Sequence, residues 1–249
     1  MPFSLRHLLV AAAGLTAAAA CAFAAARAGA AAVCGEGTYA YAGFAEQSAV
    51  GGVTATIQQA GPLAVHAGHV AAWIGIVDPR TSSSWLQVGL SALPGQTSSA
   101  IYFEYAAPGH ARVYRQLASG IEPGQPHTFA VLEQPWSVDT WAVWVDGRPI
   151  GAPLHLAGSS RHWTAQVLGE SWAGSRSGAC NAYSYAFANV KLATRNGRWI
   201  GLDGRPIADP HYVVAQRTNT SFVASSFGVG SFRGAEVAPP APATPASNQ

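Results

Sequence analysis

Charge is scarce in this chain of 249 residues: only 10% of the residues are Asp, Glu, Lys or Arg, and the formal net charge is +2. Lys191 is the only lysine, and no basic cluster is interleaved with aromatic side chains. Proteins that bind nucleic acids usually carry a basic face of that kind. The composition therefore argues against a nucleic-acid partner.

Metal-binding patterns are missing from the sequence as well. There is no Cys-x-x-Cys pair, and the aspartates are scattered over separate turns. His66 and His69 are close in sequence, but no third ligand accompanies them. Zinc and calcium sites need three or more ligands at defined spacings. We therefore predict neither a metal nor another cofactor.

Cysteine is rare, with three in the chain. Cys21 lies in the apolar stretch Leu8–Ala26, which follows a short basic start and precedes small residues, as in a secretion signal. We predict a signal peptide over residues 1–30, secretion to the extracellular space, and no membrane attachment after cleavage; an uncleaved anchor or a lipoprotein attached through Cys21 are the alternatives. Cleavage leaves Cys34 and Cys180. In an oxidising compartment we expect these two cysteines to form a disulfide; two free thiols are the alternative.

Helical periodicity is absent over any three turns, whereas short stretches of alternating apolar and polar residues recur between turn signals such as Asp146-Gly147. This pattern predicts an all-β sandwich, jelly roll or barrel. We place one domain at residues 35–228, expect a monomer, and expect the Pro/Ala-rich residues 229–249 to be disordered. The expected strands are Tyr39–Ala45, Gly52–Ile57, His69–Val77, Ser84–Leu90, Ala100–Ala106, Ala111–Leu117, His127–Glu133, Thr140–Asp146, Ile150–Leu156, His162–Glu170, Ala182–Leu192 and Tyr212–Gln216.

A polar amide lies in the middle of the expected strand Ser84–Leu90, where Trp85, Gln87 and Gly89 share one face. The ordinary interpretation is a solvent-facing position of an antiparallel sheet. If the neighbouring strands pair, however, one face gathers aromatic and polar side chains, which is typical of a groove for an extended peptide or sugar polymer. The same aromatics could instead form the core of a second layer. These side chains are Trp73, Trp85, Gln87, Tyr102, Glu104, Tyr114, Glu170 and Trp172.

Five motifs follow one another in the chain: AAWIGI (71–76), LQVG (86–89), YFEYAAPG (102–109), IEPGQPHTFAV (121–131) and AQVLGE (165–170). Their order resembles that of landmarks in the glutamic peptidases, also called eqolisins. The resemblance spans roughly residues 53–190. It implies a concanavalin A-like antiparallel β-sandwich and cleavage of polypeptide substrates under acidic conditions.

By this resemblance Gln87 and Glu170 are the catalytic residues. Glu170 would take a proton from water, direct the hydroxide at the scissile carbonyl and return the proton to the leaving amine. Gln87 would donate a hydrogen bond to the developing oxyanion. We assign substrate binding to Trp73, Trp85, Tyr102, Glu104 and Trp172.

The sequence departs from the family pattern at two places. A run like A-E-W-I-V usually precedes the family's glutamate, whereas here Gly169 removes the side chain directly before Glu170. The tryptophan motif continues into Val77-Asp78-Pro79 instead of an acidic-glycine turn. Either departure is compatible with altered specificity or with a fold kept without activity.

Two other functions stay open at this point. A jelly-roll glycoside hydrolase would use Glu104 and Glu170 as its pair of carboxylates across an aromatic groove. No E-x-D-x-E run of the laminarinase type is present, which disfavours that interpretation. A non-catalytic secreted module that binds carbohydrate or peptide would need the groove alone.

Overall fold

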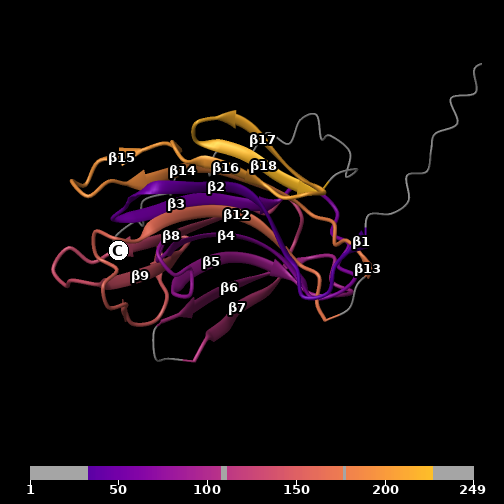
Figure 1. Cartoon of the computed structure of the whole chain (residues 1–249), viewed down its shortest axis with the longest axis horizontal. Helices are drawn as coiled ribbons and strands as arrows, with labels where there is room; N and C mark the ends of the chain where they lie inside the picture. Colours follow the sequence, from indigo (N-terminus) through magenta and orange to yellow (C-terminus); the bar gives the residue numbers. More distant parts are fainter. Residues whose placement is uncertain (1–32, 108–110, 176–177, 227–249) are drawn as a thin grey trace, which may run out of the picture. The chain divides into compact units, whose positions relative to one another are not determined.

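The structure is a computed structural model, and it describes residues 33–107, 111–175 and 178–226 (Figure 1). The predicted signal peptide and the predicted disordered tail lie outside the described residues. Within the described part of the chain, no helix is long and apolar enough to cross a membrane.

Two antiparallel sheets make up most of the described chain. The seven-stranded sheet has the order β16 (Arg205–Ala208), β2 (Tyr39–Ala49), β12 (Thr164–Trp172), β4 (His69–Val77), β5 (Trp85–Ala92), β6 (Ser99–Ala106) and β7 (Val113–Ile121). Figure 1 shows β4 to β7 following one another along one side of the fold.

The nine-stranded sheet has the order β10 (Arg148–Pro149), β9 (Thr140–Val145), β8 (His127–Glu133), β3 (Gly52–Gln59), β14 (Ser184–Ala193), β18 (Ser221–Ser226) and β17 (Tyr212–Thr218). Two short strands lie beside this path: β11 (Leu154–His155) pairs with β9, and β15 (Trp199–Ile200) pairs with β14. A separate ladder joins β1 (Val33–Cys34) to β13 (Gly178–Ala179).

The core lies between the two sheets because alternate residues of the facing strands are apolar. Ile74, Val88 and Phe103 are register partners on β4, β5 and β6, and all three are buried in the core. Ile57 and Phe129 of the other sheet belong to the same cluster. Each such side chain contributes roughly 1.5–3 kcal/mol on burial. Because one face of each strand packs into this core, the alternate residues of the seven-stranded sheet point away from it.

The predicted all-β sandwich is confirmed, but several predicted strand bounds were wrong. The expected strand Ile150–Leu156 is mostly turn, because Gly151 has a φ of 69° and only Leu154–His155 pairs with β9. The expected strand Ala111–Leu117 begins later, at Val113, and continues to Ile121. Six short or weakly patterned strands were missed altogether: β1, β10, β13, β15, β16 and β18.

A disulfide joins Cys34 to Cys180, as predicted, with a Cα–Cα distance of 4.9 Å across 146 residues of sequence. Cys34 ends β1, and Cys180 directly follows β13. The bond therefore ties the start of the described chain to the segment that enters β14.

Candidate functional site

The side chains that point away from the core on the seven-stranded sheet line two adjoining cavities. The larger, of about 450 Å³, is lined by Gln87 and Glu170 together with Trp73 and Trp85. The second, of about 360 Å³, is lined by Tyr102, Glu104, Tyr114 and Trp172. Tyr39 and Arg112 line both. All eight side chains of the expected groove therefore lie on one face of the seven-stranded sheet. We call the two cavities, together with the side chains that line them, the groove.

The floor of the groove is aromatic and closely packed. Trp73, Tyr102 and Leu168 form a buried cluster separate from the main core. Gly89 is the register partner of both Trp73 and Tyr102, and a Cβ there would lie 2.0 Å from the carbonyl oxygen of Ala72. Gly89 is therefore required for the close approach of β4 and β5 at this point.

Glu170 is held at both carboxylate oxygens, although only 5% of the residue is exposed. Its Oε2 accepts a hydrogen bond from Trp73 Nε1 at 2.9 Å. Its Oε1 lies 2.8 Å from His69 Nε2. The register of β12 with β4 explains these contacts, because Glu170 is opposite Ala71, with His69 and Trp73 two residues away on the same face. A carboxylate can accept about four hydrogen bonds, so both oxygens retain capacity for water.

His69 is a site residue that the sequence did not identify. The sequence pairs His69 with His66 without a third ligand, whereas in the structure its ring contacts Glu170. Within the described residues no group of three His, Cys, Asp or Glu side chains is placed to hold a metal ion. The signal that could have found His69 is strand alternation, because it precedes Trp73 by four residues on the same face.

Gln87 makes two hydrogen bonds through its side-chain nitrogen. Nε2 donates to the Tyr102 hydroxyl oxygen at 3.1 Å and to Glu104 Oε2 at 3.3 Å. Glu104 is the register partner of Gln87 on β6, and its other oxygen forms an ion pair with Arg112. The ion pair with Arg112 holds Glu104 in place, and Glu104 in turn holds the Gln87 amide in one orientation.

The Tyr102 hydroxyl interacts with both candidate catalytic residues, through a hydrogen bond with Gln87 and through the negative charge of Glu170. It accepts the hydrogen bond from Gln87, and burial holds its pKa well above the usual range, with the negative charges of Glu170 and Glu104 adding to the effect. The hydroxyl consequently keeps its proton over the whole physiological range and remains a hydrogen-bond donor.

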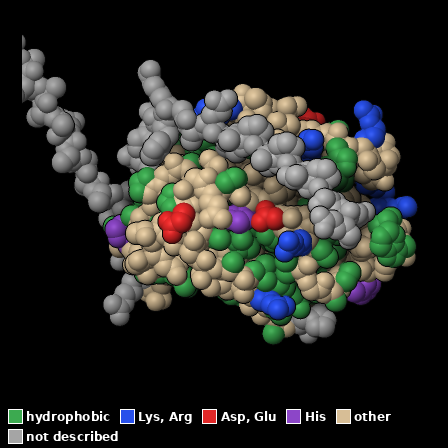
Figure 2. All heavy atoms as spheres, turned by 180° about the vertical axis from the view of Figure 1, so that it is seen from behind, with side chains coloured by type: hydrophobic (Ala, Val, Ile, Leu, Met, Phe, Trp, Pro, Cys, Tyr) green, Lys and Arg blue, Asp and Glu red, His purple; other side chains and the backbone are tan. Residues whose placement is uncertain are grey.

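Arg112 is the positive charge of the groove. Its hydrogen bond with Glu104 raises the pKa of the guanidinium, which also interacts with the Tyr39 hydroxyl. The guanidinium carbon lies 5.6 Å from the centroid of the Trp85 ring, in cation–π geometry. Arg112 thus connects the aromatic wall to Glu104. Figure 2 shows one face of the molecule, on which acidic and basic side chains are few.

Gly169, the departure beside Glu170, has a packing reason. Its position faces the core, and a Cβ there would lie 2.8 Å from Tyr183 Cε2 and 2.9 Å from the Tyr183 hydroxyl oxygen. Tyr183 is fully buried. The ring of Tyr183, which directly precedes β14 of the other sheet, therefore occupies the space that a side chain at position 169 would fill.

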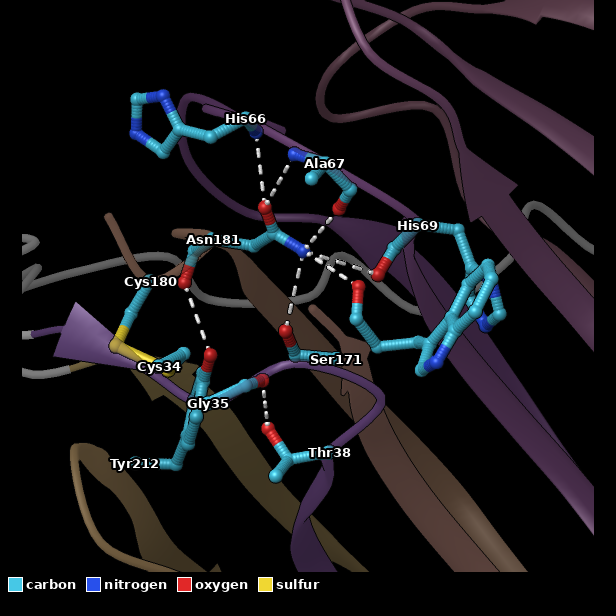
Figure 3. The surroundings of a disulfide bond; sticks show 11 residues. Cys34, Gly35, Thr38, His66, Ala67, His69, Ser171, Cys180, Asn181 and Tyr212 are labelled. Carbon is cyan, nitrogen blue, oxygen red and sulfur yellow. Dashed lines mark hydrogen bonds between the residues drawn. A yellow bond between two sulfur atoms is a disulfide. The ribbon is translucent and has the colours of Figure 1, made fainter. Parts of the chain in front are cut away.

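The end of the groove at Trp172 is anchored by the buried amide of Asn181, next to the disulfide (Figure 3). Its Oδ1 accepts hydrogen bonds from the backbone N–H groups of His66 and Ala67. Its Nδ2 donates to several oxygens, including the carbonyl oxygens of His69 and Trp172. This one side chain joins the start of β4 to the end of β12.

Comparisons with known proteins identify the fold. No family model matches the sequence, and no curated protein matches it. Among solved structures, scytalido-glutamic peptidase in complex with a peptide-based transition-state analogue has a TM-score of 0.56 at 16% identity, over 77% of this chain and 98% of that chain. SCP-B, a member of the eqolisin family solved with the tripeptide Ala-Ile-His, has a TM-score of 0.53 at 14% identity, over the same shares of the two chains. The chain therefore has the fold of the glutamic peptidases, and the predicted concanavalin A-like jelly roll is confirmed.

Proposed function

We propose that this protein is a secreted hydrolase that cleaves peptide bonds in polypeptides, with Gln87 and Glu170 as its catalytic residues. The observation that carries the proposal is that both side chains line the same 450 Å³ cavity. They do so on a fold similar to that of the glutamic peptidases. The disulfide between Cys34 and Cys180 supports an oxidising, extracellular location.

Glu170 acts as the general base in this proposal. Its ionised carboxylate takes a proton from a water molecule, and the water oxygen bonds to the scissile carbonyl carbon. The same proton then passes from Glu170 to the amide nitrogen, so that the C–N bond breaks and an amine leaves. The N–H groups that hold both oxygens fix the carboxylate in one orientation, which general-base catalysis requires.

Gln87 and Tyr102 stabilise the oxyanion of the tetrahedral intermediate. The longer of the two Gln87 bonds, to Glu104 at 3.3 Å, is the one exchanged for the substrate oxygen. Tyr102 accepts from Gln87 and keeps its own hydrogen to donate. Each fixed donor of this kind typically lowers the barrier by about 3–4 kcal/mol. An amide does not titrate, so Gln87 works over the full acid range.

The aromatic walls bind the polypeptide. Trp85 lines the larger cavity and Trp172 the smaller one, so an extended chain that occupies both cavities contacts both rings. Between them Arg112 and Glu104 form a fixed ion pair that offers polar contacts to the substrate backbone.

The glycoside hydrolase alternative is less compatible with these contacts. Glu104 has one oxygen paired with Arg112 and the other bonded to Gln87. A glycosidase acid must present a proton to the glycosidic oxygen, and a carboxylate held by a guanidinium is poorly suited to that task.

The test is digestion of a denatured protein and of a mixed-linkage glucan over a range of acidic pH, analysed by mass spectrometry. Wild type is expected to cleave the protein and not the glucan. Glu170→Gln and Gln87→Ala are expected to lose about 10²–10⁴-fold in rate, whereas Glu122→Gln, the same exchange at an exposed loop residue, keeps full activity. Protein cleavage that survives in both site variants would overturn the proposal.

A further inference from the structure

His69 makes the shortest polar contact to the candidate base, and the proposed mechanism assigns it no role beyond holding one carboxylate oxygen. Its Nε2 lies 2.8 Å from Glu170 Oε1, and the His69 side chain is 21% exposed. The preceding histidine, His66, is exposed, and its ring points away from Asn181 in Figure 3. The two histidines three residues apart thus differ sharply in their surroundings.

The position of His69 is fixed from two sides. Its carbonyl oxygen accepts a hydrogen bond from Asn181 Nδ2 at 3.3 Å, which holds the backbone at the start of β4. Its ring packs against Trp172 at a centroid distance of 5.6 Å and edge-on against Tyr39 at 6.2 Å. An imidazole confined in this way has one orientation, and that orientation directs Nε2 at Glu170.

We propose that His69 is a positioning residue that keeps Glu170 ionised and oriented, and that it thereby sets the acid limit of activity. This inference rests on the proposed function of Glu170 as the base. Histidine side chains gain a positive charge as the pH falls through the range of about 5–8. A protonated imidazole at this position places a positive charge 2.8 Å from the Glu170 carboxylate.

Other titratable and charged groups also face the pair. Tyrosines ordinarily titrate near pH 10 and arginine above 12, so these side chains keep their charge in acid solution. Glu104 is neutralised locally by Arg112. The groups that surround the pair are Tyr39 and Tyr41 from β2, Tyr102 and Glu104 from β6, Arg112 from the segment before β7, Tyr183 behind β12, and Asp209, which follows β16 and contacts Tyr41.

The sign of the effect follows from the charge. A cation beside a carboxylate favours its ionised form. A protonated Glu170 cannot accept a proton from water. The acid limb of kcat/KM therefore moves to higher pH when the charge is removed.

The activity test compares the pH profiles of His69→Gln and His69→Phe with that of His66→Gln. Glutamine keeps a hydrogen-bond donor without the charge, so we expect the acid limb to move to higher pH while the plateau kcat changes little. Phenylalanine also loses the donor, so the plateau kcat falls as well, with KM nearly unchanged. His66→Gln retains the wild-type profile. An unshifted acid limb in both His69 variants would overturn the inference.

A second readout does not depend on catalysis. NMR titration of the His69 ring, assigned with His69→Gln, is compared between wild type and Glu170→Gln. We expect the titration midpoint of His69 to be lower in Glu170→Gln than in wild type, because the ring loses its anionic partner. An unchanged midpoint refutes the coupling. If wild type cleaves no polypeptide, the proposed function fails, and this titration alone decides whether the pair is coupled.

Discussion

Gly169 provides a test of how β12 is packed behind Glu170. The residue does not have a left-handed φ, so alanine fits its backbone. Exchanges of this kind commonly stabilise a protein by about 0.4–1 kcal/mol, because the unfolded chain loses freedom. At this position, however, the new Cβ would lie within 3.0 Å of three heavy atoms, two on Tyr183 and one on Ala224. Overpacking of a core costs typically 1–3 kcal/mol, so the expected net result is a loss of about 1–2 kcal/mol.

The measurement is urea unfolding followed by tryptophan fluorescence, with Gly178→Ala as the matched control. A Cβ at Gly178 meets nothing within 4 Å, so this exchange is expected to be neutral or stabilising. In a Tyr183→Leu background the ring edge is gone, and Gly169→Ala should cost at least about 1 kcal/mol less than in wild type, as a double-mutant cycle measures it. If Gly169→Ala stabilises the protein as much as Gly178→Ala does, the proposed packing of β12 is wrong.

Three further predictions follow from the same structure. Replacement of Cys34 and Cys180 by serine should lower the free energy of unfolding by about 5 kcal/mol, because the bond spans 146 residues; a loss below about 1 kcal/mol in urea unfolding would contradict this. Tyr102→Phe should lower kcat by about 10²-fold with little change in KM, measured on a fluorogenic peptide; an unaltered kcat would remove Tyr102 from the oxyanion site. Burial raises the pKa of Tyr102 and Tyr185, so stability should fall as the pH rises above about 10, where the unfolded tyrosines ionise first; equal unfolding free energies at pH 8 and pH 11 would be inconsistent with it.

Strand alternation was sufficient to predict the fold class and the contents of the groove. Trp73 and Gln87 each lie between aliphatic residues of the core, and Glu170 lies on the strand face opposite to Ala165 and Val167, which also belong to the core. A period of two fixes which side chains share a face once neighbouring strands pair. For this reason the predicted set of groove residues agrees with the face seen in the structure.

Such local patterns do not predict contacts between segments that are far apart in the sequence. The pairing of His69 with Glu170 depends on the register between β4 and β12, which no local pattern encodes. The packing of Tyr183 against Gly169 depends on how the two sheets face each other. Arg112 lies before β7 rather than in it, so alternation alone did not indicate its ion pair with Glu104.

Short strands were missed for a related reason. Two-residue strands such as β1 and β15 are too short to show any alternation. Conversely, the apolar residues around Gly151 suggested a strand, although the positive φ of this glycine bends the chain into a turn. In both cases the tertiary partner, and not the local sequence, determines whether the segment pairs.

The most direct test of the proposed catalytic pair is the affinity of a peptide-based transition-state analogue, measured by calorimetry at the pH of maximal activity. An enzyme binds such an analogue through interactions made only in the transition state. We predict that Gln87→Ala weakens the analogue about 10²–10³-fold and leaves the affinity for an uncleaved product peptide nearly unchanged. Equal affinity of wild type and Gln87→Ala for the analogue would contradict a role for this cavity in peptide hydrolysis.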